Sequence, residues 1–163
     1  MEKVMMSIDK LLDGSATIKE SAGAFIEDPL TFFDMSYTKM QSVRRALLEE
    51  LQTAALSLRF ERQKDRIQTL SKLADRQGIS HVSEFNEVLP LCFEHTMYKS
   101  YPSYLLEKSQ FDKLTAWLDR LTPHDLSKLD TSGCHSIHSW LDLLCSETEV
   151  DPIASSGTTG TMS

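Results

Sequence analysis

The sequence predicts a folded, mainly α-helical protein: the spacing of apolar residues indicates the helices, and the composition indicates a folded domain. Apolar residues recur at three- and four-residue steps through much of the chain, and glycines or prolines separate these runs. Of the 163 residues, 40% are hydrophobic and 25% are charged, which is the profile of an ordinary folded domain. We expect helices joined by short turns over residues 31–149. Residues 1–30 have weaker periodicity and predict a loosely packed arm.

The strongest helical pattern covers residues 38–77. The charged stretch ERQKDR at residues 61–66 is either a solvated part of this helix or a break in it. Gly78 follows as a natural stop signal. Two apolar stripes define the buried face: Val43, Leu47, Leu51, Ala54, Ala55 and Leu58, followed by Phe60, Ile67, Leu70 and Ala74.

Shorter helices are expected in the second half of the chain. Ser83 is a candidate cap for a helix that ends before Pro90, and Ser109 for one that runs to Leu121. Thr122, followed by Pro123, is a standard helix start. A last amphipathic helix carries Ile137, Trp140, Leu141 and Leu144. The aromatic side chains at helical spacing indicate a core, and we expect Trp117 and Trp140 to pack against the stripe over residues 43–58.

Composition limits the possible partners. The net charge of −7 disfavours a nucleic-acid backbone as ligand, and basic residues alternate with acidic ones in the best candidate segments. No apolar run approaches the ~20 residues needed to span a bilayer, and the first residues do not resemble a secretory signal. Cys92, Cys134 and Cys145 show no disulfide framework, so reduced thiols and a cytoplasmic location are expected.

One cluster raises the question of a metal site. Cys134, His135 and His138 lie close together in sequence, and Cys145 could add a further ligand. Their spacing matches no familiar zinc motif, and His135 and His138 are typical of surface or capping residues. We therefore predict no metal site here and assign no catalytic residue.

The final residues allow two interpretations. Residues 150–154 resemble the end of a strand, because Pro152 favours extended geometry at Asp151. Next come Ser155, Ser156, Gly157, Thr158, Thr159 and Gly160. Two glycines around two threonines allow a tight turn whose N–H groups and hydroxyls could hold phosphate oxygens. The stretch is not a Walker loop, since Thr161 occupies the lysine position. The alternative is an unstructured Ser/Gly/Thr tail.

The segment ASSGTTG resembles the phosphate-binding signature of the adenylate-forming superfamily of acyl- and aryl-CoA ligases. The upstream segments LADRQGI and SEFNEVLPLCFEHTMYKSYP resemble the N-terminal region of its phenylacetate–CoA ligase and acyl-protein synthetase branch. The chain departs from the signature after Gly160, where TMS replaces the common Lys-Pro-Lys type of continuation.

The resemblance implies that these residues are the helical N-terminal flank of a larger α/β domain. It implies that residues 155–160 contact the phosphates of ATP, with Mg²⁺, and that the enzyme adenylates a carboxylic acid before passing the acyl group to a thiol such as coenzyme A. Because the family's remaining nucleotide and catalytic residues come later in its sequences, this chain is expected to be an inactive fragment. The competing expectation is a complete helical interaction module with an unstructured tail.

Overall fold

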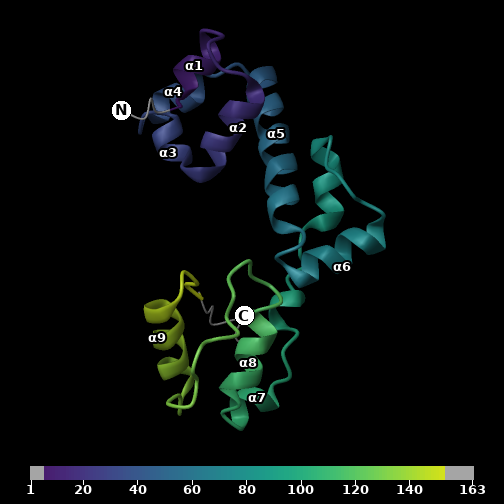
Figure 1. The fold of residues 1–163 in the computed structure, drawn as a ribbon, viewed down its shortest axis with the longest axis vertical. Helices are drawn as coiled ribbons and strands as arrows, with labels where there is room; N and C mark the ends of the chain where they lie inside the picture. Colours follow the sequence, from purple (N-terminus) through teal and green to yellow (C-terminus); the bar gives the residue numbers. More distant parts are fainter. Residues whose placement is uncertain (1–5, 153–163) are drawn as a thin grey trace. The chain divides into compact units, whose positions relative to one another are not determined.

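The computed structural model describes residues 6–152, which form α-helices and 3-10 helices and contain no strand (Figure 1). This confirms the mainly α-helical class. The chain divides into two compact units. Unit 1 comprises Met1–Gln63 with Ala74–Leu91, and unit 2 comprises Lys64–Leu73 with Cys92–Ser163.

Unit 1 is built around one long helix, α5, with α2 packed alongside it (Figure 1). Its elements are α1 (Ile8–Leu12), α2 (Ile18–Glu27), α3 (Pro29–Phe32), α4 (Tyr37–Ser42), α5 (Arg45–Gln63) and the 3-10 helix η1 (Phe85–Leu91). Helix α6 (Gln68–Gln77) is divided between the units: its residues up to Leu73 belong to unit 2, and those from Ala74 belong to unit 1.

The segment expected to be a loosely packed arm differs from that expectation, because it carries α1 and α2. Thr17 and Glu20 form a reciprocal capping box at the start of α2, with the Glu20 N–H donating to Thr17 Oγ1 at 3.3 Å and the Thr17 N–H donating to Glu20 Oε2 at 2.9 Å. Ile8 and Ala22 are buried in the core of unit 1. Short helices give a weak periodic signal, which explains the difference.

The core of unit 1 combines these N-terminal residues with one face of α5. Phe25, Phe32 and Phe33 contact one another through their rings, with centroids 5.2–5.9 Å apart. The predicted stripe contributes Leu51 and Ala55 from α5, whereas Val43 is buried in an extended position between α4 and α5. The buried set is Ile8, Leu11, Ala22, Phe32, Phe33, Val43, Leu51 and Ala55.

The charged stretch at residues 61–66 coincides with a break, because α5 ends at Gln63 and α6 begins at Gln68. Gly78 ends α6 as predicted. It adopts a left-handed conformation with φ +67°, and the Ile79 N–H donates to the Ala74 carbonyl oxygen at 2.9 Å.

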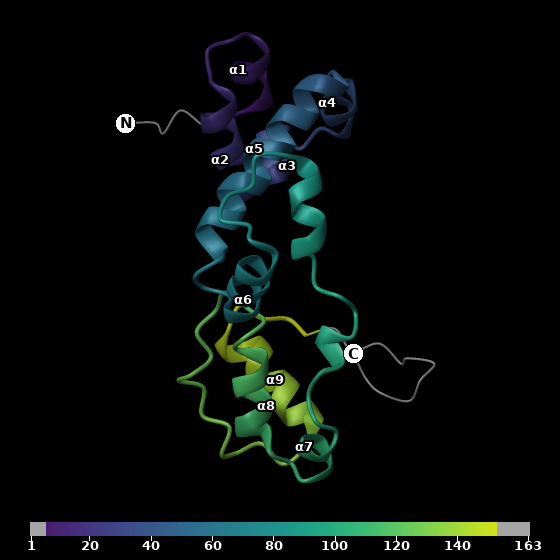
Figure 2. The ribbon, with the colours of Figure 1, turned by 90° about the vertical axis from the view of Figure 1, so that its right-hand side faces the viewer.

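Unit 2 contains the second core, which lies mainly between α8 and α9 (Figure 2). Its elements are η2 (Met97–Lys99), α7 (Tyr104–Glu107), α8 (Phe111–Leu118) and α9 (Ile137–Glu147). The buried set is Phe111, Leu114, Leu126, Cys134, Trp140 and Leu144. Trp140 belongs to this cluster and Trp117 packs against it. The expectation that the two tryptophans bury against the stripe over residues 43–58 is therefore wrong, because that stripe belongs to the core of unit 1.

Several predicted helix boundaries also need correction. Thr122 and Pro123 start no helix: residues 122–130 form bends, one turn and irregular backbone, and Thr122 Oγ1 accepts from the His124 N–H at 3.3 Å. Ser109 does not cap α8, because it adopts a left-handed conformation before Gln110, which takes the N-cap position. The segment after Ser83 is a 3-10 helix that includes Pro90 rather than ending before it.

Candidate functional site

The predicted phosphate-binding residues Ser155, Ser156, Gly157, Thr158, Thr159 and Gly160 lie outside the described residues. The structure describes the segment that leads to them as far as Pro152, and Val150–Pro152 forms no strand.

This leading segment is attached to unit 2. Val150 packs against the α8–α9 core, and its N–H donates to Thr148 Oγ1 at 3.0 Å. Thr148 Oγ1 in turn donates to the Leu144 carbonyl oxygen at 2.6 Å. Cys145 Sγ lies 3.6 Å from Asp151 Oδ1. Thr148, Val150 and Asp151 therefore have defined positions after the end of α9.

In the cysteine and histidine cluster, the structure gives contacts at the start of α9 to the Cys134 side chain and to the His135 backbone. Cys134 is buried and donates to the Ser139 carbonyl oxygen at 3.7 Å. The backbone N–H of His135 donates to Ser139 Oγ at 3.1 Å, next to the capping box that Ser136 and Ser139 form at the start of α9. Desolvation raises the pKa of the Cys145 thiol, and its hydrogen bond to Asp151 raises that pKa further. Within residues 6–152, no three metal-binding side chains come together.

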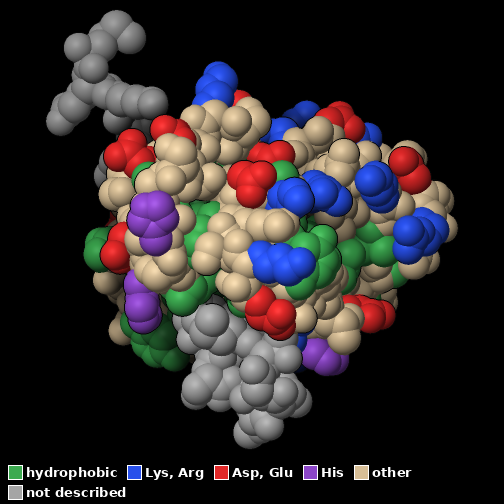
Figure 3. Space-filling model, turned by 90° about the horizontal axis from the view of Figure 1, so that it is seen from below, with side chains coloured by type: hydrophobic (Ala, Val, Ile, Leu, Met, Phe, Trp, Pro, Cys, Tyr) green, Lys and Arg blue, Asp and Glu red, His purple; other side chains and the backbone are tan. Residues whose placement is uncertain are grey.

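Two surface properties bear on the expected partners. On the face shown in Figure 3, Lys and Arg side chains are interspersed with Asp and Glu. Among the described residues, no helix has both the length and the apolar character required to cross a membrane.

Unit 1 carries an open apolar groove that sequence reasoning missed. Its larger compartment has a volume of about 700 Å³ and lies between α5 and the segment from α2 to α4. A smaller compartment of about 290 Å³ extends it toward η1. Phe25, Pro29 and Gln52 line both compartments, which makes them parts of one groove.

Large apolar side chains are exposed along this groove. Leu30 is 64% exposed, Met35 72% and Tyr37 73%, and all three line the larger compartment. Phe85, 54% exposed, lines the smaller one. Isolated apolar residues at a surface are ordinary, but a continuous groove lined by apolar side chains is typical of an interaction site.

The charged residues of the groove have one sign. Arg45 and Arg59 line its two compartments, and among the described residues the lining includes no aspartate or glutamate. Arg45, Gln52 and Arg59 are spaced by seven residues, so they form one line along α5. From the helical rise, the two arginines are about 21 Å apart along the axis.

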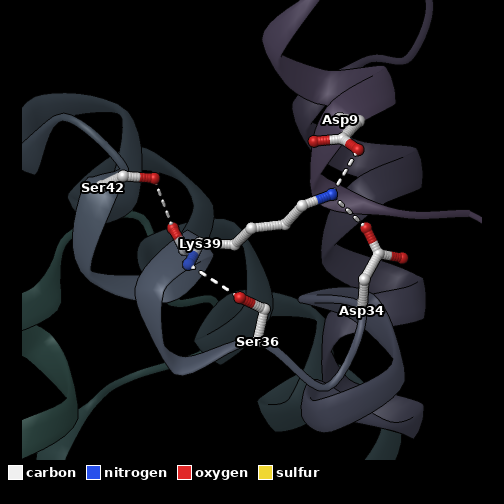
Figure 4. Close-up of polar contacts among 5 residues, drawn as sticks. All are labelled: Asp9, Asp34, Ser36, Lys39 and Ser42. Carbon is white, nitrogen blue, oxygen red and sulfur yellow. Dashed lines mark hydrogen bonds and ion pairs between the residues drawn. The ribbon is translucent and has the colours of Figure 1, made fainter.

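An ion-pair cluster holds the α3–α4 turn that forms one wall of the groove (Figure 4). Lys39 Nζ lies 2.5 Å from Asp9 Oδ2 and 2.6 Å from Asp34 Oδ2, so it connects α4 with α1 and with the turn. These carboxylates raise the pKa of Lys39, Asp34 having the larger effect. Asp34 and Met35 both adopt left-handed conformations, with φ of 52° and 56°. Such conformations cost energy in non-glycine residues, and the surrounding contacts must maintain them.

A sequence signal for this groove exists. The segment PLTFFDMSY at residues 29–37 contains five large apolar side chains in nine positions, more than one short helix can bury. The seven-residue spacing of Arg45, Gln52 and Arg59 is the second signal.

Comparison of the chain with protein-family profiles, with curated proteins and with solved structures gives no match.

Proposed function

We propose that this chain supplies the phosphate-binding loop and the helical N-terminal flank of an ATP-dependent, carboxylate-activating ligase. The observation that carries the proposal is the run Ser-Ser-Gly-Thr-Thr-Gly at residues 155–160, which resembles the signature of adenylate-forming enzymes. The anchored segment before it supports the proposal, because a loop that acts on a nucleotide needs a fixed starting point.

The proposed chemistry has two steps. A carboxylate oxygen attacks the α-phosphorus of ATP, the bond to the bridging oxygen breaks, and pyrophosphate leaves. A thiol such as coenzyme A then attacks the acyl carbon and AMP leaves. The backbone N–H groups and hydroxyls of residues 155–160 would hold the β- and γ-phosphates. Mg²⁺ would neutralise phosphate charge.

Neutral donors alone do not provide the positive charge that this reaction needs. In the family that the motif resembles, an acidic residue for Mg²⁺ and a catalytic lysine come from later segments. We therefore assign the activity to a protein that contains those segments, and we expect residues 1–163 alone to be inactive. The fold of the complete enzyme would be a larger α/β domain.

Pyrophosphate exchange into ATP, measured on the full reading frame with a panel of carboxylic acids, tests the proposal. Gly157→Val is expected to lower the exchange rate at least tenfold, since the turn and its N–H groups need glycine. Gly133→Val is the matched control, because a Cβ atom added at Gly133 meets nothing within 4 Å. The ligase assignment would be disproved if the full protein showed no acid-dependent exchange. It would also be disproved if Gly157→Val and Gly133→Val had the same exchange rate.

The groove of unit 1 favours a second candidate function, a helical interaction module. Exposed Leu30, Met35 and Tyr37 beside an open hollow are the observation that supports it. Partner binding without any ATP-dependent exchange by the full protein would favour this candidate over the ligase.

A further inference from the structure

We infer that the groove of unit 1 is a docking site for an acidic amphipathic helix of a partner protein. The inference rests on the shape and charge of the groove, so failure of the ligase proposal would leave it unaffected. It also specifies the partner that the interaction-module candidate requires.

The groove has the form that receives a helix. One wall is α5, which contributes Leu48, Gln52 and Ala55, and the other wall runs from Phe25 to Met35. Both compartments are open and have an apolar floor. An amphipathic helix buries its apolar side chains in a groove of this kind through anchors at three-, four- and seven-residue intervals.

The charges select among the possible occupants. Arg45 and Arg59 flank the apolar strip at opposite ends of α5, and their separation of 14 residues equals two heptads. A docked helix with carboxylates 14 residues apart would place one carboxylate near each guanidinium. Arginine favours carboxylate partners through its planar array of donors.

Glu49, which is paired with Arg45, does not prevent Arg45 from binding a partner carboxylate. Its Oε1 accepts from Arg45 Nε at 2.7 Å, but Glu49 lines a different hollow, together with Ala46 and Thr53. The Arg45 side chain is 91% exposed, and an exposed pair of this type contributes little, so the guanidinium remains able to take a second carboxylate.

The chain as a whole has the opposite electrostatic preference. Its net charge of −7 attracts cationic peptides at long range. A preference for an acidic helix can therefore come only from local contacts in the groove. Whether the chain binds an acidic or a basic helix more tightly is for this reason a stringent test of the inference.

The test uses two synthetic 21-residue helical peptides and the full 163-residue chain. Both peptides carry leucine at the a and d positions of three heptads. One has glutamate at two surface positions 14 residues apart, and its twin has lysine at both. Fluorescence anisotropy with trace labelled peptide measures each Kd. We expect the glutamate peptide to bind at least tenfold more tightly than the lysine peptide.

Charge reversal in the protein provides the decisive comparison. The double variant Arg45→Glu/Arg59→Glu should reverse the preference, whereas Arg44→Glu should not, because Arg44 does not line the groove. Leu30→Gln should weaken binding of the glutamate peptide at least fivefold, and Leu12→Gln, an exposed leucine on α1, is its matched control. These positions are exposed, and far-UV circular dichroism verifies that each variant is folded.

Three results would overturn the inference. Equal affinity for both peptides would show nonspecific apolar adhesion. An unchanged preference in the double variant would show that the two arginines take no part. A dimer in sedimentation velocity that Leu30→Gln dissociates would show that a second copy of the chain occupies the groove.

Discussion

The buried hydrogen bond between Trp140 and Thr115 allows a quantitative test of how the core of unit 2 is held together. Trp140 Nε1 donates to Thr115 Oγ1 at 2.8 Å, and both residues are only 5% exposed. Thr115→Val preserves the shape of the side chain but removes the acceptor, so the indole N–H loses its partner where water cannot replace it. An unsatisfied buried donor costs about 1–3 kcal/mol, and we expect the free energy of unfolding to fall by that amount.

Thr115→Ser is the matched control, since it keeps the hydroxyl and removes only a methyl group. Its expected cost is about 1 kcal/mol, which reflects lost apolar burial. Urea denaturation followed by circular dichroism measures both changes, and the NMR signal of the indole proton reports the bond itself. We expect this signal to move in the valine variant and to remain in the serine variant.

A double-mutant cycle with Trp140→Phe separates the hydrogen bond from packing. The two substitutions remove donor and acceptor together, so their combined effect should be about 1 kcal/mol smaller than the sum of the single effects. Additive effects, or a valine variant as stable as the original, would refute the claim that this bond stabilises the α8–α9 core.

Further predictions concern unit 1. Gly78→Ala should destabilise the protein by about 1 kcal/mol because φ is +67°, whereas Gly23→Ala, in the interior of α2 with open space around it, should stabilise it by a similar amount; urea titration compares the two. Leu51→Ala removes a fully buried side chain of α5 and should cost about 2–5 kcal/mol in the same assay. Hydrogen bonds from the backbone N–H groups of Ser83 and Glu84 lower the pKa of Glu87. The ionised Glu87 carboxylate therefore stabilises the fold above the ordinary glutamate pKa, and this stabilisation is lost as the pH falls through the lowered pKa. A carboxyl NMR titration in which Glu87 titrates like an exposed glutamate would contradict this.

Local signals in the sequence predicted part of the fold well. Gly78 ends α6, and Ile137, Trp140 and Leu144 lie on one helix, because stop signals and amphipathic spacing act within a few residues. Thr122 and Pro123 satisfy the same local rule but start no helix. There the chain is held by a tertiary contact instead, in which the Leu126 N–H donates to Asp119 Oδ1 at 2.8 Å.

The division into two cores was not predictable in this way. Apolar stripes indicate which faces are buried but not against which partner, so Trp140 was paired with the wrong helix. The groove was missed for a related reason: its walls come from α5 and from the segment from α2 to α4, and only the folded chain brings Pro29 and Gln52 to the same groove. The phosphate-binding assignment of residues 155–160 remains a prediction from the motif.

The placement of both tryptophans in one half of the chain has a practical consequence. Trp117 and Trp140 belong to the second core, so the tryptophan fluorescence of this protein, excited at wavelengths that tyrosine does not absorb, reports on that core and not on the helices around α5. A tryptophan introduced at Tyr37, at the rim of the groove, would add a signal from the other half and would reveal whether the two cores melt in one transition or in two.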